Sequence, residues 1–197
     1  MDRKEFDRND RAQIGRRLKL IVIVGYENTG KTTLVKSLYK RLCWRSGGIL
    51  ADNSAYWGEA VLGAGRRVNV FFGENGDDWN CVAENLYEIA KRNSADEMPF
   101  DFAIIPLRRV DFGPQSRSWA KWLMSVIDRI RGGIWGHPAI PNAFDNADVY
   151  YVHTLWPQFF PVRGGTSLAS SNTVTHPNVD ALSQIIEDQV VSLIERM

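Results

Sequence analysis

The stretch from residue 19 to residue 42 reads KLIVIVGYENTGKTTLVKSLYKRL, and it decides the fold. It overlaps LKLIVIV at residues 18–24, a nearly continuous apolar run rich in β-branched residues. Such a run is typical of a parallel strand covered by helices on both faces. From residue 34 onward, apolar side chains recur at helical spacing, with basic and polar residues opposite them. The segment therefore predicts a central strand, a glycine-containing loop and a helix.

The loop between that strand and that helix, GYENTGKT, matches the pattern G-x-x-x-x-G-K-[ST] at every fixed position. Its glycines let the backbone turn closely, so that N–H groups and the helix N-terminus can surround phosphate oxygens. Lys31 adds a positive charge at the β- and γ-phosphates, and Thr32 offers its hydroxyl to Mg²⁺. The flanking patterns disfavour the alternative, a glycine turn with an ordinary surface lysine. The expected phosphate-binding residues are Gly25, Asn28, Thr29, Gly30, Lys31, Thr32 and Thr33.

On these residues the chain resembles the P-loop NTPase superfamily, and residues 19–42 look like the opening of its small kinase-like and MobB-like members. The resemblance is confined to that segment. It implies a nucleoside triphosphate and Mg²⁺, but it implies no particular substrate. The guanine-reading tetrapeptide [NT]KxD of Ras-like members is absent from the sequence, which favours ATP over GTP.

The rest of the chain alternates strand-like and helical patterns, which predicts an α/β fold with a doubly wound, mostly parallel sheet flanked by helices. We expect one domain at residues 18–197, preceded by a charged, flexible arm at residues 1–17. Two long connections, at residues 132–147 and 156–176, are expected to be functional or mobile. The predicted strands are 48–52, 60–63, 67–72, 100–107 and 149–153; the predicted helices begin after residues 77–78, at about residue 115 and near residue 177.

The position of the acid that most such proteins place at the end of a second buried strand is ambiguous. In FDFAIIPL, at residues 100–107, Pro106 stands where that acid is expected, so either this strand is not beside the loop or its acid is missing. GENGDD, after the strand at 67–72, offers Glu74, Asp77 and Asp78, of which Glu74 and Asp77 are the leading choices for metal and catalysis. One of these aspartates also fits a helix cap. Asp52 is a further candidate for the metal or for an acceptor hydroxyl.

Basic residues follow FDFAIIPL directly. Arg108 and Arg109 come at its carboxyl end, where a guanidinium can stabilise charge on a transferred phosphoryl group, and Arg108 is the leading choice. Arg117 and Arg163, on later loops, are weaker candidates for the same role.

Composition gives no indication of several classes of function. The formal net charge of +1 gives no field for recruiting nucleic acid, and the two cysteines form no disulfide framework or zinc motif. These cysteines fit a reducing cytoplasm, and the charged residues 1–17 resemble neither a secretion signal nor a membrane anchor, so we expect a cytoplasmic protein. The sequence favours an ATPase whose turnover switches the two long loops and thereby governs a protein partner or a homodimer. A small-molecule or nucleotide kinase, and a nucleotide-responsive binding module without turnover, are the alternatives.

Overall fold

The computed structural model describes residues 17–25, 30–43, 48–49, 55–95, 99–109, 118–153, 160–161 and 179–196. The described strands form a seven-stranded sheet in the order β2-β3-β4-β5-β1-β6-β7. The four central strands run parallel, whereas β2, β3 and β7 pair antiparallel with their neighbours. The strands are β1 (Lys19–Gly25), β2 (Gly48–Ile49), β3 (Ala55–Val61), β4 (Arg67–Gly73), β5 (Phe102–Arg108), β6 (Asp148–His153) and β7 (Phe160–Pro161).

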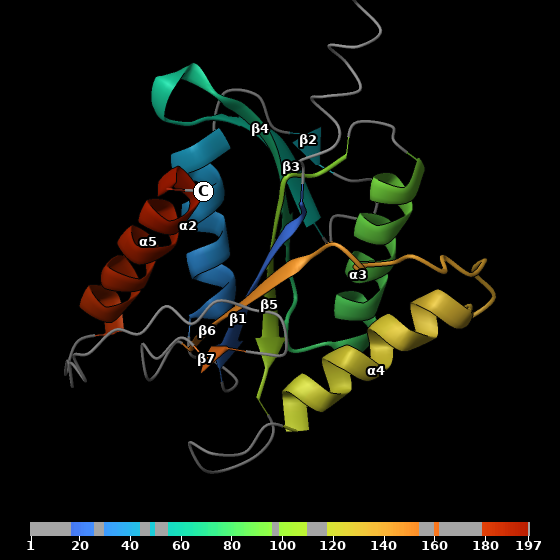
Figure 1. Cartoon of the computed structure of the whole chain (residues 1–197). Coiled ribbons are helices and arrows are strands. Elements are labelled where there is room, and N and C mark those ends of the chain that lie inside the picture. The colour runs from blue at the N-terminus through green and yellow to red at the C-terminus, as the bar shows by residue number, and fades with distance from the viewer. Residues whose placement is uncertain are drawn as a thin grey trace, which may run out of the picture.

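Helices cover both faces of this sheet (Figure 1). On one face lie α2 (Lys31–Cys43) and α5 (Val179–Arg196), and on the other lie α3 (Trp79–Ala95) and α4 (Ser118–Gly132). Successive side chains of a strand point to opposite faces, and β1 follows this rule. Leu20 and Val22 belong to the core under α3 and α4, whereas Ile21 and Ile23 belong to the core under α2 and α5. This double burial explains why the strand is apolar throughout.

The α/β class and the central position of β1 are confirmed. The expected strand at 60–63 is longer, because β3 begins at Ala55 and pairs with β4 along its whole length. Gly58 and Glu59 interrupt the apolar alternation there and hid the first half of the strand. The strand predicted at 48–52 is described only as β2, and residues 51–52 lie outside the described part. β7 was not predicted and falls inside the connection 156–176.

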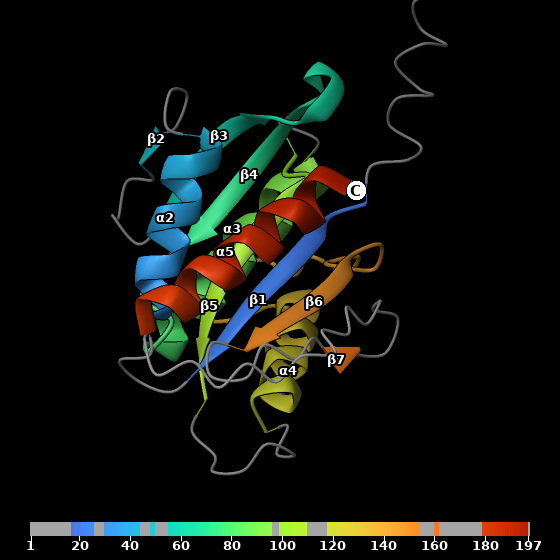
Figure 2. The same ribbon diagram turned by 90° about the vertical axis from the view of Figure 1, so that its left-hand side faces the viewer.

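Because β1, β4, β5 and β6 are parallel, their carboxyl ends lie at one edge of the sheet (Figure 2). β5 lies directly beside β1, with Pro106 opposite Ile23 and Arg108 opposite Gly25. β4 follows on the far side of β5, and their pairing ends at Phe72 and Ile104. Loops that leave β1, β4 and β5 therefore converge at this edge, which we call the carboxyl edge.

None of the helices in the described ranges has the length and apolar character needed to cross a membrane. The N-terminal arm predicted at residues 1–17 falls outside the description except for Arg17.

Candidate functional site

The glycine-containing loop leaves the sheet at the end of its central strand. Gly25 ends β1, and Lys31 begins α2. Gly30 has a φ of 78°, in the left-handed region that glycine adopts without steric cost, and its carbonyl accepts the Leu34 N–H at 2.9 Å. The helix therefore starts at the residue after the glycine, as the motif predicts. Asn28 and Thr29 lie outside the described residues.

Lys31 is almost completely buried although it carries a charge, with 3% of its surface exposed. Its Nζ lies 2.9 Å from the Asp77 Oδ1, in an ion pair that spans 46 residues of sequence. Asp77 comes from the connection between β4 and α3, so its carboxylate reaches Lys31 from beyond the neighbouring strand β5. A buried ammonium needs a partner of opposite charge, and Asp77 supplies one.

The two neighbouring acids, Asp77 and Asp78, have separate roles. Asp78 precedes α3, and its Oδ1 accepts the N–H of Asn80 at 2.8 Å. These contacts with the start of the helix, the Asn80 amide first, lower the pKa of Asp78. Asp78 is therefore the N-cap. Asp77 is left to face the loop at the start of α2.

Glu74 points to a different part of the same helix. Its Oε1 lies 3.2 Å from the Nζ of Lys36, and only 14% of its side chain is exposed. The hydrogen bond that the Tyr56 hydroxyl donates to Glu74 raises the pKa of Tyr56. Glu74 thus joins β3, β4 and α2 beside the loop. Lys36 lies one helical turn after Thr32.

The ambiguity about Pro106 is resolved by the strand order. β5 is one of the two strands that pair with β1, the other being β6, and towards its carboxyl end β5 carries Pro106 where an acid was sought. The neighbouring strand therefore lacks the acid. The carboxylate that reaches Lys31 comes from the loop after β4.

The two arginines at the carboxyl end of β5, Arg108 as its last residue and Arg109 directly after it, differ in exposure. The Arg109 N–H donates to the Gly25 carbonyl at 2.8 Å, which ties the end of β5 to the start of the loop. Its side chain is buried, with the residue only 2% exposed, whereas Arg108 is half-buried at the carboxyl edge. Of the two, Arg108 has the more accessible guanidinium. Arg117 and Arg163 lie outside the described residues.

The metal ligands predicted from the sequence are only partly described. Thr32 is half-buried in the first turn of α2, and Thr33 is exposed. Asp52 lies outside the described part of the chain. Within the described part, His, Cys, Asp and Glu side chains form no group of three that could hold a metal ion by themselves. A magnesium ion here would take most of its ligands from phosphate and water, as Mg²⁺ commonly does.

The connection at residues 132–147 lies at the opposite edge of the sheet from the loop at residues 25–33, and its expected role as a switch stays a prediction. It enters β6 at the strand's amino end, where the Asp148 N–H donates to the Leu18 carbonyl at 2.9 Å. The Arg131 side chain donates hydrogen bonds to two residues of this connection, the Ala143 carbonyl at 2.9 Å and the Asp145 carboxylate at 2.8 Å. His137 also stacks on Tyr87 of α3. A connection held in this way is a packed part of the structure.

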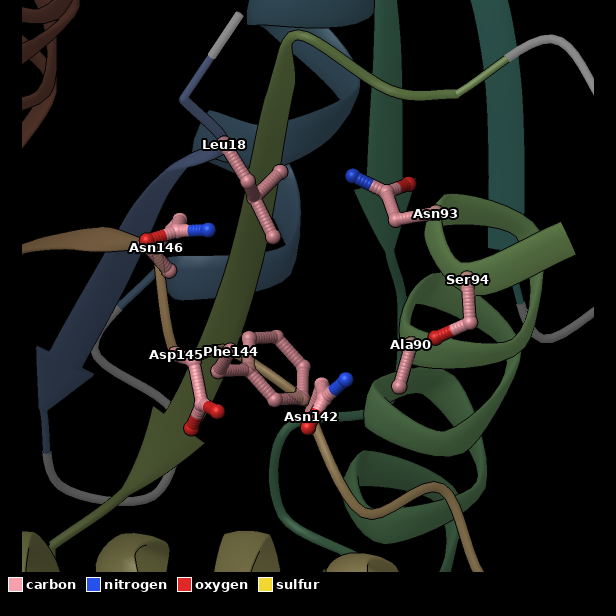
Figure 3. Close-up of a pocket in the computed structure, with 9 residues that line it drawn as sticks. Leu18, Ala90, Asn93, Ser94, Asn142, Phe144, Asp145 and Asn146 are labelled. Atoms are coloured by element: carbon pink, nitrogen blue, oxygen red, sulfur yellow. The ribbon is translucent and has the colours of Figure 1, made fainter. Parts of the chain in front are cut away.

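A cavity of about 340 Å³ separates this connection from α3 (Figure 3). Two of its polar lining residues are bonded within the protein. Asn93 exchanges two hydrogen bonds of 3.0 Å with the backbone of Phe100, and Asp145 is paired with Arg131. The cavity therefore shares neither residues nor edge with Lys31.

No protein-family model matches the chain, and no curated protein matches it either.

Sequence reasoning missed three contributors to the site: Lys36, Tyr56 and Gly76. Lys36 was assigned to the outer face of α2, and Tyr56 fell outside the predicted strand. Gly76 was given no role, although it is buried against the end of β5. The glycine between Glu74-Asn75 and Asp77-Asp78 was the available signal, since a glycine there permits close backbone approach.

Proposed function

We propose that this protein binds ATP with Mg²⁺ at the loop spanning residues 25–33 and hydrolyses it. The observation that carries the proposal is the buried Lys31 at the first position of α2, paired at 2.9 Å with an aspartate from another strand's loop. An ammonium held at a helix N-terminus, after a glycine in the left-handed region, presents positive potential where a phosphate would sit. The resemblance to P-loop NTPases supports the same reading.

The ion pair suggests how the site responds to its ligand. The β- and γ-phosphates replace Asp77 as the anionic partner of Lys31, because a phosphate carries more charge and more acceptor oxygens than a carboxylate. Asp77 would then be available to order the hydration shell of a Mg²⁺ ion, for which the Thr32 hydroxyl would be a further ligand. Arg108, half-buried at the same edge, is proposed to stabilise charge on the γ-phosphoryl group.

The position of each long connection along the sheet decides which of them we propose as the switch. The connection 132–147 is packed at the amino ends of the strands, so we do not propose it as a segment that responds to nucleotide. The connection 156–176 follows β6, whose carboxyl end shares an edge with Gly25. Apart from β7, that connection lies outside the described residues, and its response to nucleotide stays a prediction.

Pro106 favours a second candidate function. An acid that is missing from the strand beside the loop is consistent with a module that binds nucleotide without turnover. Asp77 must then serve only as the resting partner of Lys31. Turnover distinguishes this candidate from the first.

The deciding experiment measures phosphate release and ADP formation by the purified protein, with ATP or GTP, with and without Mg²⁺. Acceptor-independent phosphate release that requires Mg²⁺ supports the ATPase. ADP formation that appears only with nucleosides or small alcohols supports a kinase instead. Mg²⁺-ATP binding in calorimetry without product formation supports the binding module, and absence of binding overturns the proposal.

A further inference from the structure

The loop that delivers Asp77 rests directly on the end of β5. The carbonyl of Gly76 accepts the Arg108 N–H at 2.7 Å. A Cβ at position 76 would lie 2.5 Å from the Pro106 Cβ, 2.6 Å from its carbonyl carbon and 2.7 Å from its oxygen. Distances this short are excluded between real atoms, and two of the three contacts are to backbone that cannot rotate away. Only glycine can therefore occupy this place.

The same loop is anchored on the other side of Asp77. Asp78 caps α3, and its N–H donates to the Asn75 carbonyl at 3.0 Å. Asn75 adopts a φ of 55°, which closes the turn. Asp77 is therefore placed between a residue fixed on β5 and a residue fixed on α3. The backbone of Asp77 is thus held on both sides, and its carboxylate reaches the Lys31 Nζ.

We propose that Gly76 and Pro106 are positioning residues, which seat the loop on β5 so that Asp77 serves Lys31 and the metal in place of an acid on β5 itself. The β4–β5 pairing ends at Ile104, so the end of β5 beyond it is open to the loop. Proline there presents a compact apolar surface with no N–H that needs a partner. The catalytic consequence rests on the proposed function, but the positioning of Asp77 against Lys31 does not.

The test substitutes Gly76→Ala and compares it with Gly63→Ala, a control whose added Cβ meets nothing within 4 Å. Two quantities are measured in protein that unfolds as cooperatively as the wild type. One is the labelling rate of Lys31 by an amine-reactive reagent, read by mass spectrometry. The other is the Mg²⁺ concentration that gives half-maximal ATP turnover. Asp77→Asn provides the reference for complete loss of the carboxylate.

We expect Gly76→Ala to label Lys31 faster than the wild type and to approach the Asp77→Asn rate, because the carboxylate no longer shields the ammonium. The Mg²⁺ requirement should rise by roughly 10-fold, the size of effect seen when groups around a metal are displaced. The affinity for ATP without Mg²⁺ should not fall, since the loop 25–33 is untouched and ATP no longer has to displace the Asp77 carboxylate from Lys31. A merely structural defect would lower that affinity as well. Gly63→Ala should match the wild type in all three measurements.

If Gly76→Ala does not fold, Pro106→Gly still decides the test. It removes the proline side chain on which Gly76 packs, and it adds no atom between the loop and β5. This variant should also increase the rate of Lys31 labelling and the Mg²⁺ concentration for half-maximal turnover, each by a smaller factor than Gly76→Ala. Wild-type labelling in either folded variant overturns the positioning role. If the wild type binds no nucleotide, the proposed function fails, and the labelling arm still decides whether Gly76 and Pro106 place Asp77.

Discussion

The two ends of the parallel strands are built for different purposes. At the carboxyl edge, a buried ammonium, two acids and an arginine come from three separate loops and helix starts, close to a glycine in the left-handed region. At the amino edge, the connection 132–147 is fastened by a bond to a backbone carbonyl, a surface ion pair and a ring stack around a cavity. In the first arrangement, charged side chains pair with each other at a place where an anionic ligand could replace one partner. The second arrangement satisfies its polar groups internally, which is what a structural connection requires.

The largest expected effect is that of Lys31→Ala at the carboxyl edge. Removal of the ammonium should lower Mg²⁺-ATP turnover by at least about 100-fold, since it removes a charge-assisted contact to the phosphates. The fold should survive, because Asp77 is left with 37% of its side chain exposed and can be hydrated. Phosphate release measures the effect. The matched control is Lys40→Ala, an exposed lysine in the last turn of the same helix, and equal activity of the two variants would contradict the site.

The next effect distinguishes Asp77 from Glu74. Asp77→Asn should reduce Mg²⁺-dependent turnover by about 10- to 100-fold, as expected for a group that orders the water around a metal. Glu74→Gln should have the smaller effect, because Glu74 is engaged with Lys36 and Tyr56. Steady-state turnover over a range of Mg²⁺ concentrations separates the two. The reverse order would transfer the metal role to Glu74, and wild-type activity in both would leave Asp52 as the candidate.

The difference between the edges also explains what the sequence could predict. The strand and helix at residues 19–42 are specified locally by apolar periodicity and glycine spacing, so the strand predicted at 18–24 is found at Lys19–Gly25 and the helix begins directly after Gly30, as predicted. The partner of Lys31 depends on strand order, which no local pattern encodes. Asp77 and Asp78 are adjacent and chemically identical, and only the path of the loop over β5 decides which one caps α3. Pro106 stood out in the sequence because an acid was expected there. Its contact with Gly76 could not be predicted, because the two residues are far apart in the sequence and meet only in the fold.

At the amino edge we expect a change in stability without a change in function. Arg131→Ala removes the bonds to Ala143 and Asp145 and should lower the free energy of unfolding by about 1–2 kcal/mol. Affinity for Mg²⁺-ATP should stay within about twofold, because sites at opposite edges with no shared partners are nearly additive. Urea unfolding and calorimetric binding measure the two quantities. Arg129→Ala, an exposed arginine on the same helix, is the control. A large loss of affinity in Arg131→Ala would show that the two edges are coupled.

The smallest effect concerns the two cysteines. Burial raises the pKa of the Cys43 thiol, at the end of α2, to about 12. Its ordinary value applies in the unfolded chain, so the thiol stabilises the fold fully below that value, and this contribution is lost as pH rises toward about 12. Between about pH 8 and about pH 10 the loss should be about 1 kcal/mol, and Cys43→Ala should show a correspondingly flatter decline of unfolding free energy.

In the native protein a thiol reagent should modify Cys81, which is half-exposed, and should spare Cys43 until the chain unfolds. Cys81→Ala is the control, since its pH dependence should follow that of the wild type. Rapid modification of Cys43 under native conditions would mean that the end of α2 opens, and with it the helix that carries Lys31.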